Sequence, residues 1–246
     1  MKENVWNTFK TFVCNNFNVS LSENQINLFK IYLSELKIWN QKFNLVSFKN
    51  DEEIIFRHFA DSLAALKIIS KFRKQKLDMA DIGTGAGFPG IPIKIAIPEM
   101  HLKLIESITK KCSFLENLKA KLLLSDTEII NDRAENIGQD KKYREKSDFV
   151  VSRALSKFSP NLEMALPLTK VGGHCLIFKT ESSAFGKDGI NSVEKAYNVL
   201  GGEFIEHFCY NLPDQDLTYC ILVFEKIKNS PKEFPRKVGI PGKKPL

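Results

Sequence analysis

The sequence Asp81-Ile-Gly83-Thr-Gly85-Ala-Gly87-Phe-Pro-Gly90 decides the fold of this chain. Its first residues end a predicted strand, LDMADI, and a helix is predicted directly after it, over residues 89–97. Glycines let the chain turn tightly and let a ligand approach the backbone closely, while the helix that follows offers unpaired N–H groups. Strand, glycine loop and helix in this order predict a ligand-binding turn at the edge of an α/β sheet.

Two cofactor classes compete for this loop. The segment from Gly85 to Gly90 matches the GxGxxG letters of a dinucleotide site. In such a site the first glycine stands at the strand end and the third follows five residues later, but that position after Gly83 is Phe88. An acidic residue at the strand end followed by GxGxG instead resembles the loop of S-adenosylmethionine-dependent methyltransferases. We therefore expect Gly83, Gly85 and Gly87 to contact S-adenosylmethionine.

Three further predicted strands bring polar side chains to the same edge. Glu106 ends the second strand, where a carboxylate accepts the hydrogens of a ribose diol. The third strand ends in residues 131–135, a place that suits an adenine ring, and the fourth ends at Arg153, whose guanidinium suits a carboxylate or a phosphate. Each of these strand ends also has an alternative without a ligand. Glu106 could be an exposed glutamate, residues 131–135 a polar loop, and Arg153 could form an ion pair with Asp148 or Glu135.

The chain divides into three predicted parts. Residues 1–73 are expected to form a helical extension, in which Ser22 and Gln25 match the capping box of a helix start. Over residues 74–228 short strands alternate with helices, which predicts an α/β core with a seven-stranded, mostly parallel sheet. The last two strands are separated only by about PDQD, so they must pair antiparallel. Residues 229–246 are expected to form an irregular basic tail.

Composition and charge narrow the function classes. The formal net charge of +7 fits an anionic partner such as nucleic acid, and residues 226–246 hold seven lysines and arginines against Glu233 alone. The sequence has neither an apolar signal core near its start nor a run of 18 apolar residues, so we expect a cytoplasmic protein without a membrane span. The five cysteines form no CxxC pair, which predicts reduced, packed thiols.

Several catalytic chemistries lack their residues. The fourth strand ends in SRAL rather than the DPPY of enzymes that methylate exocyclic amines, and no cysteine follows a proline as methylation at pyrimidine C5 requires. The four histidines form no cluster with cysteines or carboxylates, so no metal site is predicted. A guanine N7 is already nucleophilic toward a sulfonium methyl group. Catalysis can therefore rest on positioning and desolvation, and no catalytic base is assigned.

Four motifs in order resemble the bacterial ribosomal RNA small subunit methyltransferase G family, also called glucose-inhibited division protein B. They are RHFADSL over residues 57–63, the glycine loop, SRA over residues 152–154, and FPRKVGIPGKKP over residues 234–245. The resemblance spans nearly the whole chain. It implies a Rossmann-like class I methyltransferase fold, preceded by a helical extension, that methylates N7 of a guanine in the 530 loop of 16S rRNA.

The resemblance also implies site residues. Carried over position by position, cofactor contacts fall on Gly83, Phe88, Ala134, Glu135 and Arg153. The chain departs from the family at two places, with Glu106 where the family often has aspartate and Ala86 where others have proline. A longer carboxylate at position 106 must pull back slightly to reach the ribose hydroxyls.

The RNA surface is expected at the basic end of the chain. Salt-sensitive phosphate contacts are predicted for five tail residues: Lys232, Arg236, Lys237, Lys243 and Lys244. Arg57 and His58 are expected on the same face, although Arg57 could instead pair with Asp61 one helical turn on. The alternative for the tail is a solvated basic end. The expected partner is 16S rRNA or the small ribosomal subunit, and the expected oligomeric state is a monomer.

Two rival functions come from other classes. The first is an RNA-binding or ribosome-binding protein with a degenerate cofactor pocket, against which the intact GxGxG loop argues. The second is a nicotinamide-dependent oxidoreductase, which the loop register, the final antiparallel strands and the lack of a separate substrate domain disfavour.

Overall fold

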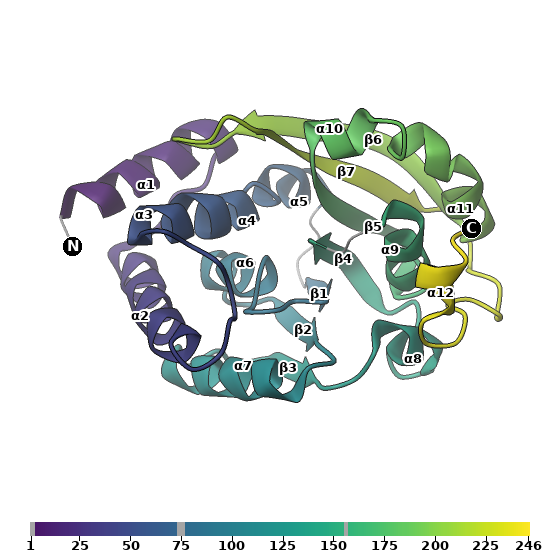
Figure 1. Cartoon of the computed structure of the whole chain (residues 1–246), viewed down its shortest axis with the longest axis horizontal. Coiled ribbons are helices and arrows are strands. Elements are labelled where there is room, and N and C mark those ends of the chain that lie inside the picture. Colours follow the sequence, from purple (N-terminus) through teal and green to yellow (C-terminus); the bar gives the residue numbers. More distant parts are fainter. Residues whose placement is uncertain (1–2, 73–76, 155–156) are drawn as a thin grey trace.

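The computed structural model describes residues 3–72, 77–154 and 157–246, and its centre is one seven-stranded sheet (Figure 1). The strands are β1 (Asp78–Ile82), β2 (His101–Ile105), β3 (Thr127–Ile130), β4 (Ser147–Arg153), β5 (Thr169–Thr180), β6 (Gly202–Asn211) and β7 (Thr218–Lys226). Their order is β3-β2-β1-β4-β5-β7-β6. The first five in this order are parallel, and β7 pairs antiparallel with β5 and β6. The predicted fold class is confirmed, including the final antiparallel pair.

Helices cover both faces of this sheet. Those of the N-terminal part are α1 (Glu3–Phe17), α2 (Glu23–Asn40), α3 (Asp51–Ile54), the π-helix η1 (Ile55–Ala60), α4 (Asp61–Leu63) and α5 (Leu66–Phe72). The others are α6 (Gly90–Ala96), α7 (Thr109–Lys121), α8 (Ala134–Gln139), α9 (Phe158–Ala165), α10 (Glu181–Phe185), the 3-10 helix η2 (Ile190–Val193), α11 (Glu194–Val199) and α12 (Ile240–Lys243). The helix predicted over residues 188–199 is thus two pieces, η2 and α11. The part boundary expected after residue 73 lies outside the described residues.

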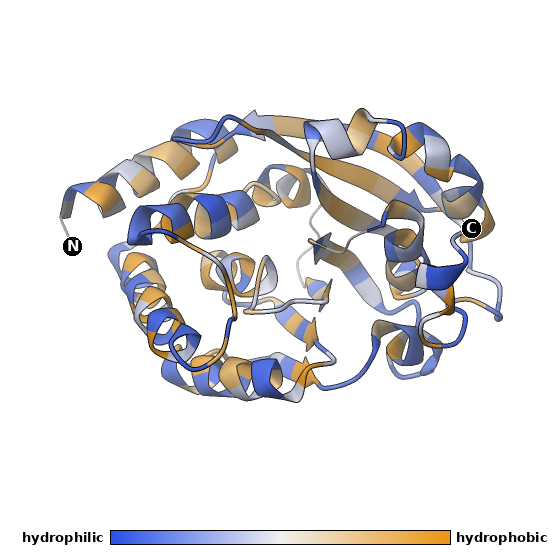
Figure 2. Ribbon diagram, viewed as in Figure 1, coloured by the Kyte–Doolittle hydropathy of each residue, from blue (hydrophilic) through white to orange (hydrophobic). Residues whose placement is uncertain are grey.

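The N-terminal helices share one apolar core with the sheet. Phe9 of α1, Phe29 of α2 and Phe59 of η1 are fully buried and belong to the same cluster as Leu104 of β2 and Val151 of β4. Burial of these apolar side chains is the main force that fixes the helices on the sheet. In Figure 2 the central strands are mainly orange, while the surrounding helices alternate orange and blue. This face carries α1 to α7, so residues 3–72 contribute directly to the core.

The predicted capping box also positions α2. The Ser22 hydroxyl accepts from the Gln25 amide (3.3 Å), and the Gln25 side chain accepts from the Ser22 amide (2.9 Å), so this prediction is confirmed. The amide nitrogen of the Gln25 side chain also donates to the Ile95 carbonyl of α6 at 2.8 Å. The cap of α2 therefore fastens it to the helix that follows the glycine loop.

A second apolar cluster fills the other face of the sheet, under α8 to α11. Ile137 of α8, Leu162 of α9 and Ala196 of α11 belong to the same cluster as Ile177 of β5 and Leu222 of β7. Among the described residues no helix is both long enough and apolar enough to cross a membrane.

The prediction that all five cysteines are reduced and packed is wrong in two respects. Cys209 of β6 and Cys220 of β7 form a disulfide, because the antiparallel register places them directly opposite each other. Cys14 is exposed, while Cys112 and Cys175 are buried free thiols as expected. Nothing in the spacing of the cysteines reveals the disulfide, since it depends on the register of the hairpin.

The C-terminal segment is more ordered than the predicted irregular tail. It contains the short helix α12, and several side chains of the core bind its backbone, among them Arg144 and Glu163. Arg144 donates to the carbonyls of Gly138, Ser230, Pro231 and Phe234. The fully buried Glu163 of α9 accepts from the backbone and guanidinium of Arg236 at 2.6 to 2.9 Å. The tail therefore lies against α8 and α9 (Figure 1).

Loss of the Arg236 side chain is expected to destabilise the chain. R236A leaves the buried Glu163 carboxylate without its cation, which should cost about 3 kcal/mol in the free energy of unfolding. The measurement is urea unfolding followed by circular dichroism. The double variant E163Q/R236A removes the unpaired charge and should recover part of the loss. A value for R236A within about 1 kcal/mol of the parent chain would contradict the structural role of this pair.

Candidate functional site

The predicted ligand residues meet at the carboxyl ends of β1, β2, β3 and β4. The strand order reverses between β1 and β4, because β2 and β3 extend the sheet to one side of β1 and the later strands extend it to the other. In open α/β sheets a ligand crevice forms at such a point. The glycine loop leaves β1 there.

Three glycines of the loop adopt conformations that other residues avoid. The φ angles of Gly83, Gly85 and Gly87 are 64°, 62° and 96°. At Gly87 an added Cβ would lie 2.6 Å from the Ile91 side chain and 2.8 Å from the Tyr32 hydroxyl. The loop therefore requires glycine both for its backbone angles and for close packing against α2 and α6.

Asp81, the acidic residue at the end of β1, is fully buried and forms hydrogen bonds with the glycine loop. Its Oδ2 accepts from the Thr84 hydroxyl (2.6 Å) and from the backbone amide of Gly90 (2.8 Å). Burial raises the pKa of Asp81 to about 7, against the opposing effect of these two hydrogen bonds and of Arg153. The carboxyl thus fixes both ends of the glycine loop and is sensitive to pH near neutrality.

Glu106, directly after β2, is buried and also forms a hydrogen bond with the glycine loop. Its Oε2 accepts from the Gly85 amide (3.0 Å) and its Oε1 from the Ile108 amide (2.9 Å). The alternative of an exposed glutamate at this position is therefore wrong. Each carboxylate oxygen has two lone pairs, so both retain capacity for a ligand hydroxyl after binding the backbone.

A cavity of about 110 Å³ opens beside these residues. Its lining combines the ends of three strands, the start of α8 and one side chain of α9: Gly83, Ile105, Glu106, Ser107, Asp132, Arg133, Ala134, Glu135 and Met164. Glu135 is buried. Its Oε1 accepts from the amide of Gly239 in the C-terminal segment (3.1 Å), and its Oε2 forms an ion pair with Arg133 Nε (3.6 Å) but no hydrogen bond to any described residue. The cavity therefore contains a buried acceptor that a ligand donor can satisfy.

Arg153 lies at the end of β4, bound to the N-terminal helices. Its guanidinium donates to Asp61 Oδ2 (2.7 Å), to His58 Nδ1 (2.9 Å) and to the carbonyl of Arg57 (3.2 Å). Asp61 Oδ1 accepts from the buried hydroxyl of Tyr210 in β6 (2.6 Å). The suggested pairs of Arg153 with Asp148 or Glu135 are therefore wrong. The suggested pair of Arg57 with Asp61 is also wrong, because Arg57 binds Glu53 at 2.9 Å.

Phe88 connects the loop with this cluster. Its ring stacks on Tyr32 (centroids 5.3 Å apart, planes at 12°) and on His58 (4.9 Å, 25°), and the Arg153 guanidinium lies 5.0 Å from its centroid. Burial and the neighbouring cations Arg153 and Arg57 lower the pKa of His58 to about 2. His58 is therefore neutral, and since Nδ1 accepts from Arg153 its hydrogen is on Nε2.

A larger pocket, of about 370 Å³, opens on the outer side of Arg153. Its lining comes from η1, α4, β4, β5, α10 and β7: Arg57, His58, Asp61, Arg153, Ala154, Phe178, Lys179, Thr180, Ser183 and Tyr219. The sequence interpretation did not identify Lys179, Thr180 and Tyr219. Lys179 and Thr180 are the last residues of β5, so their position at the carboxyl end of a strand is a sequence signal of the same kind as that of Glu106 and Arg153. Tyr32, Tyr210 and Tyr219 reach the site only through tertiary packing.

The predicted residues thus form two neighbouring groups and a separate basic segment. Gly83, Glu106, Ala134 and Glu135 line the smaller cavity, and Gly85 and Gly87 shape the loop beside it. Arg57, His58 and Arg153 line the larger pocket, and Phe88 touches it. In the C-terminal segment Lys232, Lys237, Lys243 and Lys244 are exposed, whereas Arg236 is held by Glu163.

Comparison with known proteins decides the family. The family model described as rRNA small subunit methyltransferase G matches residues 25–216. The chain belongs to this family. It is 42% identical over 229 residues to ribosomal RNA small subunit methyltransferase G of Alkaliphilus oremlandii, covering 93% of this chain and 94% of the relative. It is 39% identical over 228 residues to the protein of that name from Bacillus subtilis, covering 93% of each chain.

Solved structures agree with this membership at the level of the fold. M. jannaschii TYW2 in complex with AdoMet superposes with a TM-score of 0.52 at 14% identity, covering 68% of this chain and 77% of that one. A mutant of MtNAS gives a TM-score of 0.55 at 11% identity, covering 91% and 76%. The expected class I methyltransferase fold and the expected family are both confirmed, and the oxidoreductase alternative is set aside.

The stability of the chain should depend on Asp81 near neutral pH. Its folded-state pKa is raised from 3.8 to about 7, so between these values the folded chain holds a proton that the unfolded chain has released. The stability contributed by Asp81 is therefore present below about pH 4 and is lost as the pH rises through 7.

The near-isosteric variant D81N has no such titration and serves as the reference. Between pH 5 and pH 8, the free energy of unfolding of the parent chain minus that of D81N should fall by about 2 kcal/mol. Urea unfolding of both proteins at the two pH values measures this difference. An unchanged difference would show that the Asp81 carboxyl is ionised throughout the interval.

Proposed function

We propose that this chain transfers the methyl group of S-adenosylmethionine to N7 of a guanine in the 530 loop of 16S rRNA. The observation that carries the proposal is the arrangement of two binding spaces around one glycine loop. Gly83 lines the smaller cavity, while Phe88 of the same loop contacts His58 and Arg153 of the larger pocket. A cofactor and a base held in these spaces meet at the loop.

The residues around the smaller cavity fit S-adenosylmethionine. Glu106 accepts from the ribose hydroxyls, and Ala134 forms part of the wall. The Oε2 of buried Glu135, which lies 3.6 Å from Arg133 Nε and makes no hydrogen bond within the described residues, accepts a donor at the adenine end. The surface of Gly83, Gly85 and Gly87, free of Cβ atoms, admits the cofactor close to the backbone. Bound there, S-adenosylmethionine supplies an electrophilic methyl group on a sulfonium.

Arg153 and Phe88 complete the cofactor site. Three of the five guanidinium N–H groups of Arg153 donate to Asp61, His58 and the Arg57 carbonyl. With respect to the described residues, the other two are available to a cofactor carboxylate. The Phe88 ring, stacked between Tyr32 and His58, closes the loop with an apolar surface that excludes water.

The larger pocket, of about 370 Å³, fits a guanine base, and we call it the guanine pocket. Tyr219 offers an aromatic face for stacking, and Arg57, Lys179 and Thr180 offer donors for the guanine O6 and the neighbouring phosphate. The N7 lone pair attacks without prior deprotonation, so the pocket needs no general base. Neutral His58 agrees with this, because Nδ1 already accepts from Arg153 and the ring takes no proton at working pH. The chain then promotes methyl transfer by orienting the guanine N7 toward the methyl group and by excluding water from both.

The rest of the chain supports RNA recognition. Residues 1–73 act as a helical extension that completes the pocket through Arg57 and His58, residues 74–228 as the catalytic core, and residues 229–246 as a basic surface. Lys232, Lys237, Lys243 and Lys244 neutralise phosphates, and Arg236 holds this segment in place. The partner is 16S rRNA or the small ribosomal subunit, and the enzyme works in the cytoplasm as a monomer.

Methyl transfer to RNA tests the proposed function. Tritiated S-adenosylmethionine is incubated with the chain and with 16S rRNA, or with 30S subunits, from cells that lack the enzyme. Nuclease digestion should recover the label as N7-methylguanosine from the 530 loop. Label at another base or position would replace the substrate assignment. Tight cofactor binding without label in either RNA would reject the proposed reaction on ribosomal RNA.

Replacement of Gly83 by valine should abolish cofactor binding. The residue has φ of 64°, which a branched side chain opposes, and its added atoms would occupy the wall of the cavity. We expect the Kd for S-adenosylmethionine, measured by calorimetry, to rise by about 100-fold.

G172V is the matched control. Gly172 has a similar φ of 78°, but an added Cβ there meets nothing within 4 Å and the residue lies near the start of β5, at the edge opposite the site. It should lose stability through backbone strain while its Kd stays unchanged. Cofactor affinity of folded G83V equal to that of G172V would contradict the role of the loop.

A further inference from the structure

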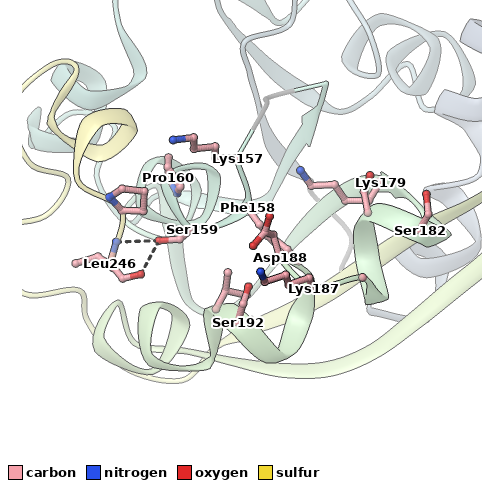
Figure 3. Close-up of a pocket in the computed structure, with 14 residues that line it drawn as sticks. Lys157, Phe158, Ser159, Pro160, Lys179, Ser182, Lys187, Asp188, Ser192 and Leu246 are labelled. Carbon is pink, nitrogen blue, oxygen red and sulfur yellow. Dashed lines mark hydrogen bonds between the residues drawn. The ribbon is translucent and has the colours of Figure 1, made fainter.

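A cavity of about 680 Å³, drawn in Figure 3, shares lining residues with the proposed guanine pocket. It is bounded by the start of α9, the end of β5, the segment from α10 to η2, and the last two residues of the chain. Lys179 and Ser183 line both this cavity and the guanine pocket. The two spaces therefore form one continuous surface. We call the cavity of about 680 Å³ the lysine groove.

The polar side chains of the lysine groove are mainly hydrogen-bond donors. Its described lining includes three lysines (Lys157, Lys179, Lys187) and four serines (Ser159, Ser182, Ser183, Ser192), against the single acidic side chain of Asp188. Lys157 and Lys187 are exposed. Lys157 makes a contact of 3.5 Å with the Gly242 carbonyl, and an ammonium has three N–H groups to offer. Such a lining suits an anion with many acceptor oxygens.

The C-terminal segment adds positive charge at one end of the groove. Leu246 is fixed to α9, since its amide donates to the Ser159 hydroxyl (3.1 Å) and its carbonyl oxygen accepts from that hydroxyl (3.3 Å), as drawn in Figure 3. This places the end of the chain at the rim. Lys243 and Lys244, both exposed, directly precede the lining residues Pro245 and Leu246. Basic side chains thus continue from the guanine pocket to the tail.

We propose that the lysine groove binds the sugar–phosphate backbone of the RNA strand that carries the target guanine. The inference rests on the proposed function, because a base in the guanine pocket must have its neighbouring nucleotides on a surface continuous with it. A small anion would need only one cluster of donors, whereas the lysines here are spread along an open surface. Lysines and serine hydroxyls that contact phosphate carry no sequence information, so the groove positions the strand and the pocket selects the base.

The test uses the full-length chain and a fluorescent 16S rRNA fragment that contains the 530 loop. Binding is followed by anisotropy from 50 to 300 mM salt in the presence of S-adenosylhomocysteine. For K157A/K187A we expect the slope of log K against log salt to fall by about 1.5, since each lost contact to single-stranded phosphate removes about 0.7. The affinity at 150 mM salt should drop about tenfold, while the Kd for the cofactor stays at the parent value.

K141A/K146A is the matched control. Both lysines are exposed in the turn just before β4, at the opposite edge of the sheet from the groove, so the variant loses the same charge elsewhere. Its salt slope should equal that of the parent chain. S182E is a second, independent variant, which places a negative charge in the groove without removing a lysine and should also weaken RNA binding.

The outcomes separate this inference from the proposed function. Equal salt slopes for K157A/K187A and K141A/K146A, with S182E binding like the parent chain, would overturn the groove as an RNA site. Failure of the parent chain to methylate ribosomal RNA would instead reject the proposed function, while the binding series would still decide where RNA contacts the protein. Loss of affinity in K157A/K187A with an unchanged salt slope would also overturn the proposal, since it would show that no phosphate contact was removed.

Discussion

The position of the Arg153 guanidinium is the constraint on which the rest of the site depends. A cation that is largely removed from water, as Arg153 is with its side chain 15% exposed, is stable only when its surroundings neutralise it and accept its hydrogen bonds. Asp61 supplies the charge and His58 a ring nitrogen, both from the N-terminal helices, while Tyr210 of β6 satisfies the second oxygen of Asp61. One side chain at the end of β4 thereby joins three parts of the chain that are distant in sequence, and the helical extension becomes part of the functional site.

Two buried carboxylates give the glycine loop its shape before any ligand binds. Asp81 holds Thr84 and the Gly90 amide, and Glu106 holds the Gly85 amide. Because these bonds fix φ angles that are accessible mainly to glycine, the backbone surface is ready to receive a ligand and loses little conformational entropy on binding. The loop is thus both a turn of the fold and a preorganised binding surface.

The C-terminal segment connects the smaller cavity with the lysine groove. Glu163 anchors it through Arg236, Glu135 binds its Gly239 amide, and Ser159 binds Leu246. A segment rich in lysine, glycine and proline would be expected to stay in solvent, but these contacts, together with the hydrogen bonds from Arg144, hold it along α8 and α9. Its charge is therefore displayed at a fixed place rather than averaged over a mobile end.

Much of the fold could be predicted from local sequence patterns. Alternating strands and helices determine an α/β sheet, the short PDQD connection determines the antiparallel end, and the position of the glycine loop determines the edge where ligands bind. Strand ends also locate Glu106 and Arg153, since parallel strands bring their carboxyl ends to one edge. These features depend on periodicity, turn chemistry and connection length, which act over a few neighbouring residues.

Only the tertiary structure decided which side chains meet. The sequence could not show that Arg153 binds Asp61 rather than Asp148, that Cys209 and Cys220 form a disulfide, or that Tyr32 and His58 enclose Phe88. Each contact joins elements whose relative position depends on packing of the whole core, and a strand register can shift by one residue without a change in local propensity. The sequence by itself therefore determined the scaffold and the edge that binds ligands. Packing determined the partners of each charge at that edge, because a buried ion pair exists only where long-range burial brings both groups together.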